Sequence, residues 1–521
     1  MTQFEDAAAA AATAPQLPFT GDEYLESLRD GREVWIYGER VDDVTAHPAF
    51  RNSARSLARL YDALHDPQYR DRLTAPTDTG NGGFTHPLFK AARTQDDLRA
   101  SRDAVRVWAE LTFGWMGRSP DYKAAMLGAL GGAPEWYGEY AGNARRWYRE
   151  GQEKVLYLGH AIVPPPVDRD LPPDDVADVY VHVEDETDNG LIVSGAKVVA
   201  TGSPLTHQVF ISHFGVPLRK KAYALVFLAP TNAPGVKFLS RASYELAAAR
   251  AASPFDYPLS SRLDENDSII VFDRARIPWE NVLVYDVEKS NAYDAQSGWI
   301  GRALLQAATR MAVKLEFLCG LMAKALDIKG GGDSRLLQAA FGEIIVYRNA
   351  VAAMVDGMIE NPQPQLGGHA LLPNESYGTA YAAMAPVMYR RVKEIIQSTV
   401  SSGLIYLNSN AVDFDQPQMR RYMDRFMRGT GGITAEERSK VMKLFWDAIG
   451  SEFGGRHELY ELNYFGPPEL NHLGMLEIAR HDGSIDRWRG LVDRCLADYD
   501  RSGWTAPDLV NPDDVSAVRH G

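Results

Sequence analysis

The chain has 521 residues, 45% hydrophobic and 24% charged, a composition typical of a globular protein with a large core. Its 69 acidic and 55 basic residues give a formal net charge of −14, which argues against a nucleic-acid surface and against binding to an anionic membrane. Cys319 and Cys495 are too few for a disulfide scaffold, a zinc site or an iron–sulfur cluster, so we expect no metal and a reducing compartment.

Residues 1–18 have acidic residues where a secretory signal has basic ones, and their apolar part is alanine. We expect a disordered tail, and no window approaches the roughly 20 apolar residues of a membrane span. The protein is therefore predicted to be cytoplasmic. From residue 19 to 155 the pattern is mostly helical, as in PAFRNSARSLARLYDALHD, where apolar residues recur at helical spacing.

The stretch GWMGRSPDYKA predicts a helix start inside this first domain. Ser119 suits the N-cap, Pro120 the first helical position and Asp121 the first turn. Arg118 and Tyr122 would then flank a helix N-terminus, which is a favourable place for an oxyanion.

Short alternating segments replace the helices from residue 156 to 285. Asp188-Asn189-Gly190 separates two β-rich runs and predicts a hairpin, and further runs at 207–214, 222–230, 236–240 and 268–278 continue the strand pattern. Residues 286–521 return to long helices that are apolar on several faces, which predicts a C-terminal four-helix bundle with a tail. Thr434 and Glu437 form a predicted capping box.

This order defines an α+β protein: an N-terminal helical domain, a middle antiparallel β-barrel domain and a helical bundle. The layout resembles the acyl-CoA dehydrogenase fold, in which a flavin lies between the β domain and the bundle. Resemblance at the level of the fold alone says nothing about the reaction.

Longer phrases make the resemblance more specific. GRSPDY (117–122), VSGAKVVATGSPLTH (193–207), SPFDYPLSSRLDENDSIIVFD (253–273), IPWENVLVY (277–285) and GSEFGGRHELYE (450–461) together resemble the 4-hydroxyphenylacetate 3-monooxygenase family. Its members are oxygenase components of two-component, reduced-flavin-dependent aromatic hydroxylases. Within the family, the sequence is most similar to actinobacterial members that act on p-coumarate or tyrosine-like phenols.

The resemblance implies that Arg118 and Tyr122 act together with His160 as catalytic and substrate-binding residues. It also implies ortho-hydroxylation of a para-substituted phenol to a catechol through a flavin C4a-hydroperoxide. A histidine can accept the phenol proton near neutral pH, and an arginine can hold the developing phenolate. Without the resemblance, a purely structural role would be expected for each residue: Arg118 as a surface cation, Tyr122 as a core tyrosine and His160 as a structural histidine. Family members commonly carry asparagine before this histidine, where this chain has Gly159.

The resemblance further implies FAD, used as FADH2 with O2 as cosubstrate, bound by three segments, and a substrate contact at Gly215 and Val216. The implied flavin contacts are His160, Ala161, Ile162, Pro166, Val167, Asp168 and Arg169; Thr201 and Ser203; and Gly450, Ser451, Glu452, Phe453, Gly454, Gly455 and Arg456. The substrate is a 4-hydroxyphenylacetate-, p-coumarate- or tyrosine-like phenol, free or tethered to a carrier protein. The charged side chains of Arg219, Lys220 and Lys221 either contact the para substituent of the substrate or the arm of a carrier protein, or are exposed to solvent with no such role.

No nicotinamide-binding fingerprint or P-loop is present, so we expect a separate NAD(P)H flavin reductase. A homotetramer is predicted from the wide apolar surface of the C-terminal helices. Three alternatives compete with this interpretation: an acyl-CoA dehydrogenase-type flavoenzyme, the related dehydratase branch of the fold, and a catalytically silent scaffold. The dehydratase branch carries an iron–sulfur cluster held by three cysteines and a histidine, which two cysteines cannot supply.

Overall fold

The structure, a computed structural model, describes residues 16–168, 171, 173–330, 332–501 and 503–506. Most of the predicted tail 1–18 lies outside the described residues. Across the described ranges, no helix combines the length and the apolarity that crossing a membrane requires.

The first part of the chain is mostly helical, as predicted, but it also contributes strands. β1 (Glu33–Ile36) and β2 (Glu39–Val41) extend a sheet of the middle region, where β1 pairs parallel with β10. The helices are α1 (Gly21–Ser27), α2 (Arg51–His65), α3 (Pro67–Leu73), α4 (Gln95–Leu111), α5 (Pro120–Gly132) and α6 (Ala141–Lys154), and β3 (Ala75–Pro76) pairs with β4 (Phe84–Thr85).

The middle region forms two sheets, ordered β2-β1-β10-β11-β7-β6 and β12-β9-β8-β5. Most strand pairs are antiparallel, as expected, but β1–β10 and β5–β8 are parallel. The predicted hairpin is present, with Thr187 of β6 opposite Gly190 of β7. The strands are β5 (Leu158–Ala161), β6 (His182–Thr187), β7 (Gly190–Lys197), β8 (Gln208–Ile211), β9 (Leu225–Pro230), β10 (Val236–Ser240), β11 (Ser268–Ile277) and β12 (Val282–Tyr285), with α7 (Tyr244–Ala251) before β11.

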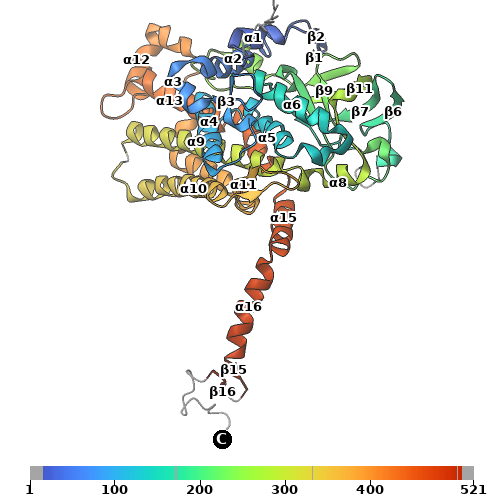
Figure 1. Cartoon of the computed structure of the whole chain (residues 1–521). Helices are drawn as coiled ribbons and strands as arrows, with labels where there is room; N and C mark the ends of the chain where they lie inside the picture. Colours follow the sequence, from blue (N-terminus) through green and yellow to red (C-terminus); the bar gives the residue numbers. More distant parts are fainter. Residues whose placement is uncertain (1–15, 169–170, 172, 331, 502, 507–521) are drawn as a thin grey trace, which may run out of the picture.

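The C-terminal region is helical, and its long helices pack beside the N-terminal helices (Figure 1). The capping box at Thr434 is present and opens α13. Pro386 lies inside α11 and does not end it. The elements are α8 (Val287–Gln296), α9 (Trp299–Lys329), α10 (Arg335–Glu360), α11 (Glu375–Val400), α12 (Pro417–Phe426), α13 (Ala435–Ile449), α14 (Glu452–Asn463), α15 (Pro468–His481) and α16 (Ser484–Ala497), with the short pairs β13 (Gln363–Pro364)–β14 (Leu371–Leu372) and β15 (Tyr499–Asp500)–β16 (Gly503–Trp504).

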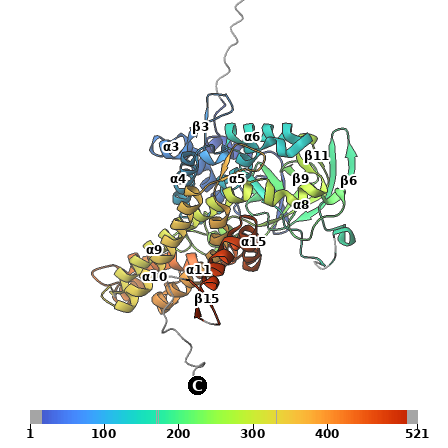
Figure 2. The same cartoon turned by 60° about the horizontal axis from the view of Figure 1, so that its bottom comes forward.

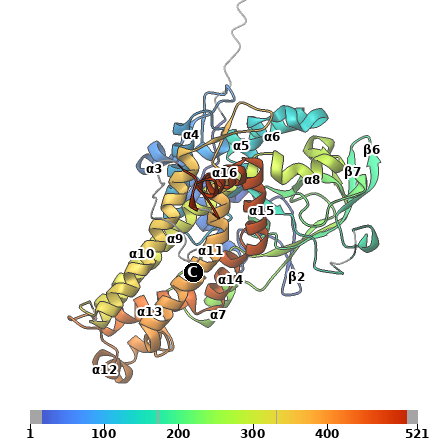
Figure 3. The ribbon, with the colours of Figure 1, turned by 90° about the horizontal axis from the view of Figure 1, so that it is seen from below.

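Helices α15 and α16 form an arm that leaves the body of the molecule (Figure 1), with α15 still packed against α11. In Figure 2 the arm comes forward and overlaps the body. Viewed from below, α14 and α15 lie beside α11 (Figure 3). The fold therefore places α14 between the bundle and the arm.

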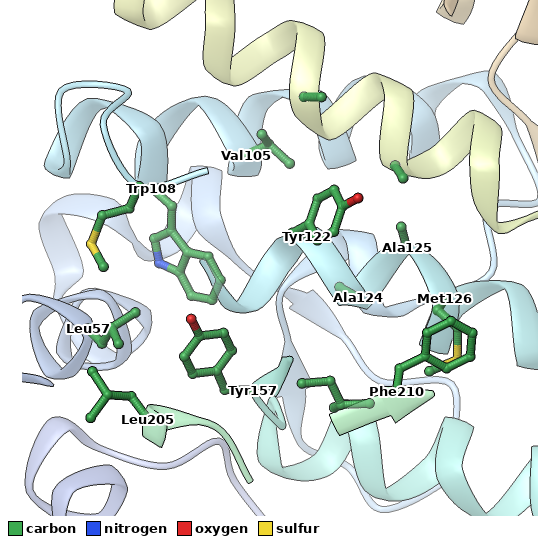
Figure 4. Close-up of a cluster of buried hydrophobic side chains, with 14 of the residues drawn as sticks. Leu57, Val105, Trp108, Tyr122, Ala124, Ala125, Met126, Tyr157, Leu205 and Phe210 are labelled. Carbon is green, nitrogen blue, oxygen red and sulfur yellow. The ribbon is translucent and has the colours of Figure 1, made fainter. Parts of the chain in front are cut away.

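Helix α5 is the central element of the core. Every residue of it except Gly131 is buried, since it packs against α6, α9 and β5. Figure 4 shows Tyr122 of α5 among buried side chains of α4, such as Val105 and Trp108, with Tyr157 and Phe210 nearby. A helix enclosed on all sides can hold polar side chains away from water.

Candidate active site

The start of α5 carries the polar residues that the sequence singled out. The helix begins at Pro120 with Ser119 at the N-cap, as predicted, but the serine hydroxyl donates to Asp121 (2.5 Å) instead of capping the backbone. Burial raises the pKa of Asp121 to about 6. The backbone N–H groups at the start of α5 therefore lie in a buried, hydrogen-bonded environment.

Arg118, Tyr122 and His160 come together as a buried cluster. The guanidinium carbon of Arg118 lies 3.9 Å from the centre of the Tyr122 ring, and the rings of Tyr122 and His160 are 5.3 Å apart. His160 is the third residue of β5, and all three side chains are at most 8% exposed. The structure thus joins the three residues that the resemblance had linked.

Arg118 is held by ring stacking more than by hydrogen bonds. Its guanidinium carbon lies 4.0 Å from the Tyr464 ring centre and 5.2 Å from that of Tyr460, both near the end of α14. Its backbone N–H donates to Glu265 (2.6 Å), and its carbonyl accepts from Tyr157 (2.7 Å). The Nε and Nη1 atoms are buried without a partner. Such orphaned donors point to an absent acceptor, because burying them unpaired costs free energy.

Burial, together with the neighbouring charges, sets the protonation of the cluster. Burial, then the charges of Lys123 and Arg118, hold the pKa of His160 well below its usual value. Burial raises the pKa of Tyr122, although Arg118 opposes that effect. At neutral pH the histidine is therefore neutral and able to accept a proton, while the tyrosine keeps its hydroxyl proton and can donate.

Two of the flavin contacts expected from the sequence meet at an unexpected carboxylate, Asp267. The hydroxyl of Thr201 donates to Asp267 Oδ1 (2.7 Å), and Arg456 donates to both oxygens (2.6 and 3.0 Å). Burial alone would raise the pKa of Asp267, but Arg456 and Arg241 hold it well below its usual value. Ser203, at the start of a buried turn, has a hydroxyl with no partner.

The segment Gly450–Arg456 spans the junction between α13 and α14 and the first turn of α14. Ser451 is the N-cap of α14 and accepts from the Gly454 N–H (3.1 Å). The Phe453 side chain packs into the core, whereas Glu452 is exposed. No atom lies within 4 Å of the place where a Cβ on Gly455 would stand, so the backbone there is open to a ligand.

The remaining expected contacts lie on two segments beside β5 and β8. Ala161 ends β5 and is buried, and the Ile162 carbonyl accepts from Lys197 (3.0 Å). Gly215 and Val216 lie in the exposed loop between β8 and β9. Pro166, Val167 and Asp168 are exposed, and Arg169 lies outside the described residues.

Gly159 stands where family members commonly carry asparagine. A side chain at this position would point to the face of β5 opposite His160, because successive side chains of a strand alternate. A Cβ at this position would stand 2.7 Å from the Ser203 hydroxyl and 3.3 Å from Thr206. The glycine therefore affects the surroundings of Ser203 and not those of the histidine ring.

Several residues of this region were not expected from the sequence. Tyr460 and Tyr464 contact Arg118 from a helix far along the chain. Asp267 accepts hydrogen bonds from Thr201 and Arg456, which are two of the expected flavin contacts. The spacing of Arg456, Tyr460 and Tyr464, four residues apart on one helix, was a signal that they share a face. Lys123 was within the quoted stretch but was given no role.

Helices, two sheets and further helices, with a buried Arg–Tyr–His cluster beside expected flavin contacts, define a flavoprotein of the acyl-CoA dehydrogenase-like fold. The chain belongs to the 4-hydroxyphenylacetate 3-hydroxylase family. The family's N-terminal part matches residues 20–284, and its C-terminal part matches residues 290–493. The family resemblance inferred from the sequence is confirmed, and the acyl-CoA dehydrogenase alternative is set aside.

Several characterised relatives match nearly the whole chain. The 4-nitrophenol 2-monooxygenase oxygenase component of Rhodococcus sp is 54% identical, covering 96% of both chains. A Streptomyces globisporus monooxygenase, named for (3S)-3-amino-3-(3-chloro-4-hydroxyphenyl)propanoyl-[peptidyl-carrier protein SgcC2], is 54% identical and covers 97% of this chain and 95% of its own. The Escherichia coli 4-hydroxyphenylacetate 3-monooxygenase oxygenase component is 52% identical, covering 96% and 97%.

Solved structures agree with the expected fold. A 4-hydroxyphenylacetate 3-monooxygenase oxygenase component in complex with FAD and 4-hydroxyphenylacetate has a TM-score of 0.85 and 34% identity, covering 92% of this chain and 99% of its own. An archaeal 4-hydroxybutyryl-CoA dehydratase has a TM-score of 0.79 at 18% identity, covering 90% and 95%. The second likeness shows that the fold is shared and carries nothing about the reaction. The acyl-CoA dehydrogenase-like fold is thus confirmed.

Proposed function

We propose that this chain is the oxygenase component of a two-component monooxygenase that converts a para-substituted phenol to a catechol with reduced FAD and O2. The observation that carries the proposal is the buried Arg118, with two unpartnered nitrogens, stacked on Tyr122 beside a neutral His160. The three relatives named above all act, by their names, on phenols with a para substituent.

The residues of the chain fit a bound flavin. Ser203 offers an orphaned buried hydroxyl, and Gly455 leaves open space at the start of α14. We assign the flavin ring to the segments around His160–Ile162 and Thr201–Ser203, and the dinucleotide to Gly450–Arg456. When bound, the reduced flavin supplies the two electrons with which O2 gives one oxygen atom to the ring and one to water.

The chain's own residues prepare the phenol for that step. His160 accepts the phenol proton, so the O–H electron pair stays on the phenol oxygen and enriches the ortho carbon. Arg118 holds the resulting phenolate with its free nitrogens, and it cannot lose its own charge. Tyr122 donates its hydroxyl proton in a hydrogen bond to an oxygen in the same space. Burial of the cluster keeps water away from it.

Catechol yield tests this assignment. Arg118→Ala, Tyr122→Phe and His160→Ala should each lower catechol formed per reduced FAD consumed, by about 10²–10⁴-fold for the general base and about 10²–10³-fold for an oxyanion donor. His160→Ala should also release more hydrogen peroxide. If all three variants fold and keep near-normal catechol yield, the site assignment is wrong.

The substrate class stays a choice between a free phenol and one tethered to a carrier protein. Lys221, a candidate for contact with the substrate tail, pairs with Glu186 (3.4 Å) and lies 4.1 Å from the Tyr285 ring centre. This engagement favours a structural role for Lys221. A panel of 4-hydroxyphenylacetate, p-coumarate, tyrosine and carrier-tethered tyrosine, compared by kcat/KM, decides between the two classes.

Reduced flavin would come from a separate NAD(P)H-dependent reductase, and we place both components in the cytoplasm. Support comes from the relatives named as oxygenase components and from the two free cysteines, which suit a reducing compartment. Stopped-flow mixing of the purified chain with reduced FAD and air should oxidise the flavin, whereas NADH alone should not be consumed.

We also infer a homotetramer, supported by the projecting arm. Apolar residues face solvent on both of its helices: Leu470, Leu473, Leu476, Trp488, Leu491 and Val492, each at least 40% exposed. An exposed apolar stripe of this size is typical of a protein–protein contact. Light scattering should give four times the chain mass of 57.7 kDa, and Leu473→Glu with Leu491→Glu should lower it. A monomeric wild type would contradict the inference.

A further inference from the structure

Lys123, the neighbour of Tyr122 on α5, is fully buried in the core. Its side chain is 0% exposed, and its ammonium nitrogen has no hydrogen-bond partner. An ammonium group removed from water without a counter-ion costs free energy. A buried lysine of this kind therefore points to something that its charge serves.

Three aromatic rings surround the Lys123 nitrogen. It lies 3.8 Å from the ring centre of Trp299 and 4.9 Å from those of Phe210 and Tyr122. Rings attract a cation through their negative faces and can hold it without a hydrogen bond. The cage thus keeps the amine in place and leaves its N–H donors unused.

Two of the three rings also border His160. Phe210 of β8 is the register partner of His160 in β5, so both side chains leave the sheet on the same face. Tyr122 packs against the histidine ring at 5.3 Å. The lysine and the histidine are therefore neighbours across a shared pair of rings, and among the charges that lower the pKa of His160 that of Lys123 acts most strongly.

The described carboxylates nearby form no hydrogen bond with Lys123, although the charge of Asp294 opposes the lowering of the lysine's pKa by burial. Asp121 accepts from Ser119 and Gln306, Asp294 of α8 accepts from the Trp299 indole (3.1 Å), and Glu265 accepts from the Arg118 backbone N–H. The other titratable groups that face the cluster are Tyr122, His160 and Tyr464. Within the described residues, none of these groups hydrogen bonds to Lys123. Arg118 and Lys123 both keep buried nitrogens without a hydrogen-bond partner in the described part of the chain, and an anionic ligand would satisfy these donors.

We propose that Lys123 is a second cationic residue of the phenol site, which with Arg118 stabilises the phenolate form of the bound substrate. The inference rests on the function proposed above. The phenol O–H bond breaks, the proton moves to the imidazole of His160, and the electron pair stays on the phenol oxygen. Burial and the charge of Arg118 lower the pKa of Lys123, whereas Asp294 and an arriving phenolate raise it, so phenolate binding favours the ammonium form.

The experiment measures the ionisation of a bound phenol without turnover. 4-Nitrophenol is added to the protein with reduced FAD under anaerobic conditions, and the visible band of its phenolate is followed against pH. We compare the wild type with Lys123→Met, which keeps the length and apolar body of the side chain, and with Lys123→Gln. Lys289→Met is the matched control, because Lys289 also lies against an indole ring, that of Trp136, but donates to a carbonyl (3.0 Å).

In the wild type and Lys289→Met, bound 4-nitrophenol should ionise at a lower pH than the free phenol. In Lys123→Met and Lys123→Gln it should ionise about one pH unit higher than in the wild type, a tenfold loss of acidity. Because an unpaired buried charge is removed, Lys123→Met should melt at or above the wild-type temperature.

The outcomes separate the two proposals. If Lys123→Met and the wild type titrate bound 4-nitrophenol alike while Arg118→Met shifts it, the role of Lys123 is overturned and the phenol site stands. If Lys123→Met and Lys123→Gln both melt far below the wild type, the lysine is structural and the inference is again overturned. If the wild type does not change the ionisation of the phenol, the proposed acid–base function fails.

Discussion

The buried charge cluster behind the site gives the sharpest prediction. Glu461 of α14 accepts from Arg310 Nη2 (2.8 Å) and Lys314 Nζ (2.8 Å) of α9, and all three side chains are at most 1% exposed. Replacing Glu461 with glutamine keeps the shape but leaves two buried cations without a counter-charge. Breaking a buried ion pair from one side costs about 3–5 kcal/mol. Lys314 can relieve part of this cost by releasing its proton, since burial already lowers its pKa to about 8, whereas Arg310 cannot.

Chemical denaturation at one fixed protein concentration measures the loss, since subunit association would otherwise contribute. Glu458→Gln is the control, because Glu458 lies on the same helix but pairs with Lys393 in a partly exposed position. That substitution should cost less than about 1 kcal/mol. A Glu461→Gln variant that loses no more free energy of unfolding than the control would refute the argument.

The same carboxylate predicts a pH dependence. Burial alone would raise the pKa of Glu461, but Arg310 and Lys314 lower it from 4.5 to about 2. The unfolded state therefore binds the proton first, so the stabilisation is complete above about pH 4.5 and is lost as the pH falls toward 2. Glutamine does not titrate. The difference in unfolding free energy between the wild type and Glu461→Gln should therefore shrink below pH 4.5, and a constant difference would contradict this assignment.

Two further substitutions test how the site is built. Tyr464→Ala removes a ring whose centre lies 4.0 Å from the Arg118 guanidinium carbon. It should weaken phenol binding by up to about thirtyfold, which corresponds to about 2 kcal/mol for a desolvated cation–π contact. Tyr464→Phe keeps the ring and should bind phenol nearly normally in the same titration. Gly454→Ala places a Cβ 2.8 Å from the Ala448 carbonyl and should lower both the melting temperature and the affinity for reduced FAD, whereas Gly455→Ala, with open space around it, should melt as the wild type does.

Local signals in the sequence were reliable where a few neighbouring residues decide the structure. The Ser119–Pro120 start of α5 and the Thr434 capping box are settled within a single turn, and both are present. The hairpin before Gly190 is likewise a matter of a few adjacent residues. The parallel pairing of β1 with β10 has no such local signal, since its two strands lie about 200 residues apart.

The site was predicted in part for the same reason. Arg118, Tyr122 and His160 were found by resemblance, and nothing in composition or periodicity would have joined the histidine to the other two. Lys123 escaped attention because α5 is buried all round, so helical periodicity gives no polar face on which a lysine would stand out. Asp267 could not be linked to Thr201 and Arg456 without the fold that brings them together.

Helix α14 explains how an arginine with two unused nitrogens can keep a fixed place. Arg456, anchored on Asp267, lies 4.5 Å from the Tyr460 ring centre; the Tyr460 and Tyr464 rings are 4.9 Å apart; and Tyr464 lies against Arg118. Residues four apart on a helix share one face, so α14 places these stacked side chains in one row between the expected flavin turn and the phenol cluster. Stacking fixes the plane of the guanidinium without consuming its donors. The Nε and Nη1 donors that a phenolate needs are therefore free, because the guanidinium is held mainly by rings and by one long hydrogen bond from Nη2 to the Tyr464 carbonyl (3.5 Å).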